Sequence, residues 1–157
     1  MHARNAVLRG LSPKENRHAP PLRYEVAYRL KRDFPNLEVI LNGGVTTLAQ
    51  LEHHLAQVDG VMLGRAAYHN PWLLAGIDRR FYQIEAAAAQ RTDVIPILKA
   101  YYARECARGA PLSAMTRHIA GLYHGMPGAR HWRRTLSDPK RRADGLAQWP
   151  DEAAGTA

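Results

Sequence analysis

Two glycine-bearing segments hold the residues of this sequence best suited to bind an anion. An asparagine and two glycines, residues 42–44, follow the apolar run 37–41, and Gly64 with Arg65 follows the apolar run 58–63. Glycine lets backbone N–H groups approach an oxyanion closely, and the guanidinium of arginine is a planar fork that suits phosphate. A single Gly-Gly after a strand would be weak evidence, because tight turns use it often. Two such turns in succession predict a phosphate site.

The elements that must position these turns are two strands joined by a helix. Residues 37–41 and 58–63 are short and apolar, which is typical of strands buried on both faces. Helical spacing of apolar residues predicts helices at 22–34 and 47–57. Strand, helix, strand with short connections indicates parallel strands in an α/β fold, with both carboxyl ends at one edge. Ligands bind beyond that edge, and the two turns resemble the phosphate site after the last two strands of a (β/α)8 barrel.

The N-terminal 21 residues form a polar loop, because they combine Gly, Pro, Ser and Asn without an apolar period. His2 is expected where a preceding strand ends, so Lys14 and Arg17 of the loop would lie at the same end of the strands. Exposed basic residues on a loop usually serve solubility, and the alternative is that these two project over the ligand site. Asn42 either hydrogen-bonds a cofactor hydroxyl or braces its turn.

The chain changes character after Pro71, where helices replace strands. One or two short helices are expected at 72–82, an amphipathic helix at 94–107, another at 112–123, and a short basic helix behind Pro127 and Gly128. The sequence therefore divides into four regions: an α/β region at residues 1–82, a linker at 83–92, a helical region at 93–137, and a tail at 138–157 that is low in apolar residues and expected to be partly disordered.

The net charge of +8 is confined to one region. Residues 98–142 contain ten Lys or Arg against Glu105 and Asp138, and the rest of the chain is neutral. A localised positive charge predicts a polyanionic partner, and the alternative is a solvated basic face. Arg130, Arg133 and Arg134 lie three and four residues apart, on one helix face, and are expected to contact RNA. Trp132 between them either anchors the helix in a core or stacks on a base, and we favour the anchor.

Several classes of protein are excluded by composition. The single cysteine, Cys106, cannot form an internal disulfide and is read as a small core residue, which fits a reducing cytoplasm. No apolar run approaches the roughly 18 residues of a membrane span, so a soluble cytoplasmic protein is expected. His53 and His54 are adjacent and point to different helix faces, which makes a poor metal pair. No zinc motif, catalytic triad or Walker loop is present, so no metal is expected.

The motifs in their order resemble the C-terminal half of an A-type tRNA-dihydrouridine synthase. The resemblance runs from His2 to about Leu136 and covers most of the chain, through "HAR", "GLSPKENR", "PPLRYEV", "LKRDFPNL", "NGG", "VDGVMLGRAAY" and "TRHIAGLYHGMPGARHWRR". SPKENR together with GMPGARHWRR is specific to the subtype. NGG and GR alone would indicate only a flavin-binding barrel.

The resemblance implies a TIM barrel that holds FMN, followed by an α-helical tRNA-binding domain. Such enzymes use NADPH to reduce the flavin, which reduces D-loop uridines of tRNA (positions 20 and 20a in this subtype) to 5,6-dihydrouridine. By resemblance the FMN-binding positions are His2, Asn42, Gly43, Gly44, Gly64 and Arg65. The tRNA-binding positions implied in the same way are Lys14, Arg17, Arg130 and Arg133.

The chain departs from the family pattern in one large respect. It contains no "NxGCP" type motif, in which family members carry the cysteine that protonates the uridine, and Cys106 lies in the helical region, so no catalytic residue is assigned here. We therefore expect a fragment that is inactive alone. The full-length enzyme is expected to be monomeric, whereas an open barrel favours association. Two alternatives remain: a non-catalytic RNA-binding module, and another FMN-binding barrel oxidoreductase that acts on small molecules.

Overall fold

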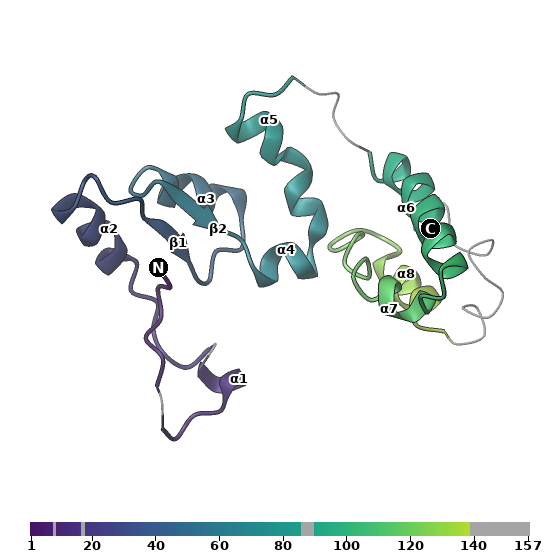
Figure 1. Cartoon of the computed structure of the whole chain (residues 1–157), viewed down its shortest axis with the longest axis horizontal. Coiled ribbons are helices and arrows are strands. Elements are labelled where there is room, and N and C mark those ends of the chain that lie inside the picture. Colours follow the sequence, from purple (N-terminus) through teal and green to yellow (C-terminus); the bar gives the residue numbers. More distant parts are fainter. Residues whose placement is uncertain (8, 17, 86–89, 139–157) are drawn as a thin grey trace. The chain divides into compact units, whose positions relative to one another are not determined.

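The computed structural model describes residues 1–7, 9–16, 18–85 and 90–138, in two compact units, Met1–Ala66 and Ala67–Ala157. Figure 1 labels their helices and strands. The described residues of the first unit include both strands, and those of the second are helical. The tail predicted at 138–157 lies outside the described residues from position 139 onward.

The first unit is built on two parallel strands, β1 (Ile40–Asn42) and β2 (Gly60–Met62). Ile40 lies opposite Gly60, and Asn42 lies opposite Met62. Helix α2 (Tyr24–Asp33) precedes β1, and helix α3 (Leu48–Leu55) connects the two strands (Figure 1). The α/β arrangement with parallel strands is confirmed. His2 forms a further parallel bridge with Asn42, so the N-terminal segment lies beside β1 as expected.

Only one face of this small sheet is covered by the helices. Leu41 is fully buried with Val39, Ala27 and Val58, whereas Ile40 is 47% exposed. Successive side chains of a strand point to opposite faces, so covering one face leaves every second residue exposed. Met62, in register with Asn42, is also 47% exposed. The expectation that both strands are buried on both faces is therefore wrong for the chain that the structure describes.

An ion pair fastens the amino ends of the strands to α2. The Lys31 ammonium lies 2.7 Å from Asp59 Oδ1 and donates to the carbonyls of Pro35 and Leu37. Asp59 Oδ2 accepts a hydrogen bond from the Val39 amide at 2.8 Å. The hydrogen bond from Lys31 is the main cause that lowers the pKa of the Asp59 carboxyl. These bonds tie both strands to α2 at the end opposite the glycine turns.

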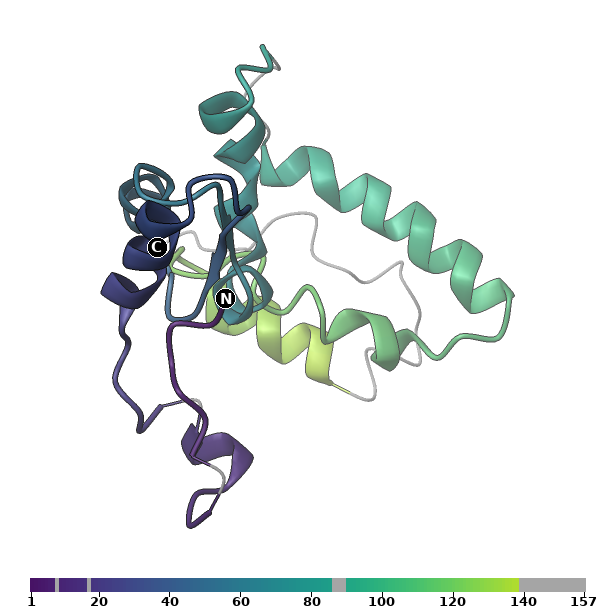
Figure 2. The same ribbon diagram turned by 60° about the vertical axis from the view of Figure 1, so that its left-hand side comes forward.

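The second unit is formed by short helices around one long helix. Residues 65–81 form α4 (Arg65–His69), the 3-10 helix η1 (Pro71–Gly76) and α5 (Ile77–Phe81), followed by α6 (Arg91–Ala107), α7 (Leu112–Thr116) and α8 (Ala129–Ser137). Figure 2 shows α6 as the long helix, with α7 and α8 across from it. Helix α4 begins at Arg65, within the first unit, and crosses into the second.

The core of the second unit is closed around Trp132, which is fully buried. Its indole N–H donates to the Ile119 carbonyl at 2.9 Å, and its ring lies 4.9 Å from that of Tyr123. Trp72 packs against the same cluster, and the Arg91 guanidinium lies 4.4 Å from the centre of the Trp72 ring. Because Trp72 packs against this core, the boundary between the compact units lies after Ala66 and not at the linker expected at 83–92. Part of that linker lies outside the described residues. The domain division itself stays a prediction.

The helix expected at 112–123 is wrong, because α7 ends at Thr116. Turns follow it, in which Leu122 N–H donates to the Ile119 carbonyl and His124 N–H donates to that of Gly121. Gly121 lies so close to the His69 backbone that an added Cβ would be 2.1 Å from the His69 carbonyl oxygen. A backbone contact of this kind excludes any side chain at position 121.

Two kinds of feature are absent from the described residues. None of the helices in residues 1–7, 9–16, 18–85 and 90–138 has the length and apolar character that a bilayer crossing needs. The same residues contain no group of three or more His, Cys, Asp or Glu side chains arranged to hold a metal ion.

Candidate functional site

The turn after β1 has a backbone conformation that strongly favours glycine. Gly43 has φ = 122° and Gly44 has φ = 72°, which L residues with side chains rarely adopt. A Cβ at Gly44 would also lie 2.6 Å from Leu22 Cδ1 and 3.0 Å from the Tyr24 hydroxyl oxygen. The Gly43 carbonyl accepts a hydrogen bond from that hydroxyl at 2.9 Å. Gly43 is buried and Gly44 is exposed, so the turn ends at the surface.

The turn after β2 leaves the same edge of the sheet. Because Asn42 and Met62 are paired in parallel register, residues 43–44 and 63–65 both continue from carboxyl strand ends. Gly64 and Arg65 are exposed. Asn42 shares the sheet face of Ile40, since residues two apart on a strand point the same way. The two glycine turns predicted from the sequence are thus neighbours.

His2 lies against the first of these turns. Its imidazole carbons and nitrogens are so close to Gly43 that a Cβ there would be 3.1 Å from Cε1 and 3.3 Å from Nε2. Its Nδ1 accepts a hydrogen bond from the Arg4 backbone N–H at 3.0 Å. In a neutral ring the proton is therefore on Nε2, the nitrogen next to the turn. His2 joins the turn through the chain as well, because the Ala3 N–H donates to the Asn42 carbonyl at 2.7 Å.

The loop that carries SPKENR is closed at its base and braced inside. The Arg23 N–H donates to the Ala3 carbonyl at 2.8 Å, and Arg4 donates to the carbonyls of His18 and Pro20. Asn16 exchanges hydrogen bonds with the Val7 backbone, at 2.7 Å to its Oδ1 and 2.9 Å from its Nδ2. Asn16 of the motif is therefore structural.

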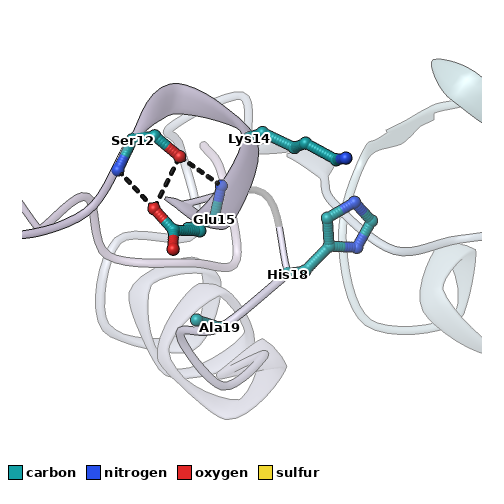
Figure 3. Close-up of a pocket in the computed structure, with 5 residues that line it drawn as sticks. All are labelled: Ser12, Lys14, Glu15, His18 and Ala19. Carbon is teal, nitrogen blue, oxygen red and sulfur yellow. Dashed lines mark hydrogen bonds between the residues drawn. The ribbon is translucent and has the colours of Figure 1, made fainter.

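Ser12 and Glu15 form a local pair at the start of α1 (Pro13–Asn16). The Glu15 carboxylate accepts from the Ser12 hydroxyl at 2.6 Å and from the Ser12 N–H at 2.8 Å, as Figure 3 shows. The hydrogen bond from the Ser12 side chain is the main cause that lowers the pKa of Glu15. This carboxylate is turned back onto the loop, whereas Lys14 is exposed. Lys14 is therefore an exposed basic residue of the motif, and Arg17 lies outside the described residues.

His18 is a residue of this region that the sequence did not indicate. A pocket of about 600 Å³ is lined by Ser12, Lys14, Glu15, His18 and Ala19. In Figure 3 the side chains of Lys14 and His18 extend on the same side of the loop. The Arg65 Nη1 lies 3.1 Å from His18 Nε2, so this imidazole links the loop to the turn after β2. A single histidine in a polar loop carries no pattern, and only the fold brings it to Arg65.

The basic helix α8 lies in the second unit. Trp132 is fully buried and lies on the face of α8 that packs into the core, which confirms that it anchors the helix. Arg130, Arg133 and Arg134 are exposed on the rest of its surface. Cys106 of α6 is half-buried and carries a free thiol. The predicted site residues therefore fall in two groups: those of the glycine turns with His2 and Lys14 in the first unit, and the arginines of α8 in the second.

Comparison with known proteins places these features in a family. The model of the family described as "Dihydrouridine synthase (Dus)" matches residues 1–156. The chain belongs to this family. Among curated dihydrouridine synthases, it is 52% identical over 147 residues to the tRNA-dihydrouridine(20/20a) synthase of Pseudomonas aeruginosa. It is 51% identical over 138 residues to the protein of that name from Vibrio cholerae, and 49% identical over 138 residues to the one from Synechocystis.

The chain spans less than half of these dihydrouridine synthases. The matches cover 93%, 88% and 88% of this chain but 44%, 42% and 41% of the relatives from Pseudomonas aeruginosa, Vibrio cholerae and Synechocystis. Both groups of predicted site residues lie within the segment that is covered by the family model.

Proposed function

We propose that this chain is the portion of a tRNA-dihydrouridine synthase that holds the FMN phosphate and contacts tRNA. The observation that carries the proposal is the pair of adjacent parallel strands whose carboxyl ends continue into residues 43–44 and 64–65. The names of the relatives, tRNA-dihydrouridine(20/20a) synthase, support formation of dihydrouridine in tRNA. That the uridines lie in the D-loop and that NADPH is the reductant are further parts of this proposal, implied by the resemblance in sequence. In this proposal β1 and β2 are the last two strands of a TIM barrel, followed by a helical tRNA-binding domain, in a cytoplasmic enzyme.

The residues present fit the phosphate of FMN. Leu22 and Tyr24 occupy the side of Gly44 where a Cβ would lie, and Gly44 is exposed, so a phosphate oxygen can approach its backbone from the solvent side. Arg65 supplies the charge. A Cβ added to Gly64 would meet only the Met62 side chain, at 3.7 Å, beyond its own chain neighbours, so among the described residues the second turn is open on that side. His2 Nε2 and the Asn42 side chain are further polar groups at this edge. When bound, the reduced flavin supplies the hydride that uridine C6 accepts; the chain's own residues orient the cofactor.

The second half of the proposal concerns tRNA. Arg130 and Arg133 are held on a helix whose buried side is fixed by Trp132, so their charges are displayed on a rigid surface. Lys14 and Arg17 would contribute from the loop over the cofactor. Phosphate contacts of this kind position RNA and make binding sensitive to salt.

A flavin titration tests the cofactor site. Quenching of FMN fluorescence by the purified chain is expected at micromolar concentration, and Arg65→Ala should weaken binding about tenfold, because a charge-assisted hydrogen bond is lost. Arg23→Ala is the matched control, since Arg23 is exposed and pairs with Glu25. Equal binding by the wild type and Arg65→Ala would contradict the assignment.

A salt titration tests the tRNA surface. Arg130→Ala combined with Arg133→Ala should weaken tRNA binding and reduce the dependence of log K on log salt by roughly 1 to 2. The double variant Arg23→Ala with Arg29→Ala removes the same charge from α2 and its cap and should leave the slope unchanged. Unchanged binding by the α8 variant would contradict the role of these arginines.

A second function is favoured by one specific observation. All of the net charge falls in residues 98–142, most of which belong to a helical unit with its own core. A non-catalytic RNA-binding module would bind tRNA without binding FMN, and the two titrations separate this alternative from the first. The dihydrouridine synthase match argues against a barrel oxidoreductase that acts on small molecules.

A further inference from the structure

A group of three aromatic rings lies behind the turn formed by Gly43 and Gly44. The Tyr24 ring, at the start of α2, lies 4.3 Å from the His54 ring of α3, centre to centre. The Tyr28 hydroxyl lies 2.5 Å from His54 Nδ1. His54 is 5% exposed, so α2 and α3 share a buried polar contact. Tyr24 and Tyr28 are one helical turn apart and both touch His54, but only Tyr24 has a hydrogen bond to the glycine turn.

The hydroxyl of Tyr24 fixes one peptide unit of this turn. It donates to the Gly43 carbonyl at 2.9 Å. In a trans peptide the carbonyl oxygen and the following N–H point in opposite directions. With the Gly43 carbonyl directed at Tyr24, the Gly44 N–H is directed away from α2. Two consecutive glycines can adopt many backbone conformations. The hydrogen bond from Tyr24 therefore selects one orientation of the peptide between Gly43 and Gly44.

Steric contact limits the turn from the same side. The position of a Cβ on Gly44 would lie 3.0 Å from the Tyr24 oxygen and 2.6 Å from Leu22 Cδ1. Gly44 is therefore seated on Tyr24 and Leu22, and its peptide cannot rotate toward them without overlap. The Tyr24 ring itself is held by His54 of α3, the helix that follows the turn along the chain.

We infer that Tyr24 is a positioning residue for phosphate recognition: its ring packs against that of His54, and its hydroxyl, which donates to the Gly43 carbonyl, orients the Gly44 amide toward the ligand. The inference rests on the proposed function, because it takes the ligand to be the FMN phosphate. Burial raises the pKa of the Tyr24 hydroxyl, which keeps it a neutral donor near pH 7. Tyr24 acts through the glycine turn and need not touch the flavin.

The test compares Tyr24→Phe with Tyr28→Phe, using FMN and riboflavin as ligands. Riboflavin has the same ring system without the phosphate, so it separates phosphate recognition from a general loss of structure. Tyr24→Phe should weaken FMN binding about fivefold, the effect of one hydrogen bond, and change riboflavin binding less than twofold. Tyr28→Phe removes a hydroxyl that lies on the same helix and contacts the same histidine. This variant should change neither FMN binding nor riboflavin binding.

A second measurement does not depend on flavin. In ¹⁵N NMR spectra of the free chain, Tyr24→Phe should shift the Gly44 amide and speed its hydrogen exchange, whereas Tyr28→Phe should leave both unchanged. If Tyr24→Phe weakens the binding of FMN and of riboflavin equally, or if it leaves the shift and exchange of the Gly44 amide unchanged, the positioning role is overturned. If the amide responds as expected and the wild-type chain does not bind FMN, the role of Tyr24 in the turn stands and the proposed cofactor assignment fails.

Discussion

The two units of this chain bury their apolar residues in different ways. In the helical unit the core surrounds Trp132 on all sides, with Ile95, Tyr102 and Tyr123 also buried. In the α/β unit the core lies on one side of the strands, and Ile40 on the other side is 47% exposed.

The difference follows from the geometry of helices and sheets. A short helix has one apolar stripe, which its neighbours in the same unit can cover. A parallel sheet has two apolar faces, and helix α3 with α2 covers one of them. Met1, Ile40 and Met62 are among the exposed apolar residues on and beside these strands. The association that we expect for this chain would involve them.

The largest effect is expected from a substitution that disrupts the core of the helical unit and leaves the core of the α/β unit intact. Trp132→Ala should lower its free energy of unfolding by about 3–5 kcal/mol, because it removes a fully buried ring and its hydrogen bond to Ile119. Arg133→Ala, on the exposed side of α8, is the control and should change it by about 0.5 kcal/mol or less. Hydrogen exchange resolved by peptide should show lost protection in residues 90–138 and unchanged protection in residues 22–63. Loss in both segments would mean that the units do not have separate cores.

The next effect sharpens the contrast between the two faces of β1. Leu41→Ala should destabilise the α/β unit by about 2–5 kcal/mol, whereas the neighbouring Ile40→Ala should cost about 0.5 kcal/mol or less. Urea unfolding followed by hydrogen exchange of this unit measures both values. Similar losses for the two variants would show that the face of Ile40 is packed in solution. In that case a falling light-scattering signal for Ile40→Ala would identify the packing as self-association.

A smaller effect distinguishes two glycines of the α/β unit. Gly44→Ala should cost about 1–3 kcal/mol, because φ = 72° is unfavourable for alanine and its Cβ would meet Leu22. Gly10 has φ = 86° but nothing within 4 Å of an added Cβ, so Gly10→Ala should cost only about 1 kcal/mol. Thermal unfolding of both variants gives the comparison. A larger loss at Gly10 would contradict the contact at Gly44.

The smallest effect is a pH dependence confined to the α/β unit. Burial, with a smaller contribution from His53, lowers the pKa of His54 below its ordinary value of 6.5. The unfolded chain therefore binds a proton at higher pH than the folded unit does, so stability is full above about pH 6.5 and falls as the pH drops below it. Thermal melts of the wild type and His54→Gln between pH 7.5 and 5 should show the wild type losing more stability on acidification. Parallel pH profiles would contradict a buried neutral imidazole.

Local patterns predicted much of the fold. The helices α2, α3, α6 and α8 lie within a few residues of their expected positions, because amphipathic spacing and prolines act on each segment separately. The parallel strands and the adjacent glycine turns followed from the short β-α-β connection. The helix expected at 112–123 ends at Thr116, and Gly121 in the turns that follow packs on the His69 backbone, a contact between segments that no local period encodes.

Residue types and their order were enough to name the groups that we propose bind an anion: glycines that permit φ of 72° and 122°, an arginine after the second strand, and a cluster of basic residues along one stretch of chain. The groups that support them became known only from the folded chain. Folding places His18 against Arg65, His2 against Gly43 and the Tyr24 hydroxyl on the Gly43 carbonyl. Residue type and local spacing fix backbone preferences, whereas hydrogen bonds between distant segments depend on how helices and strands pack, which no single segment specifies.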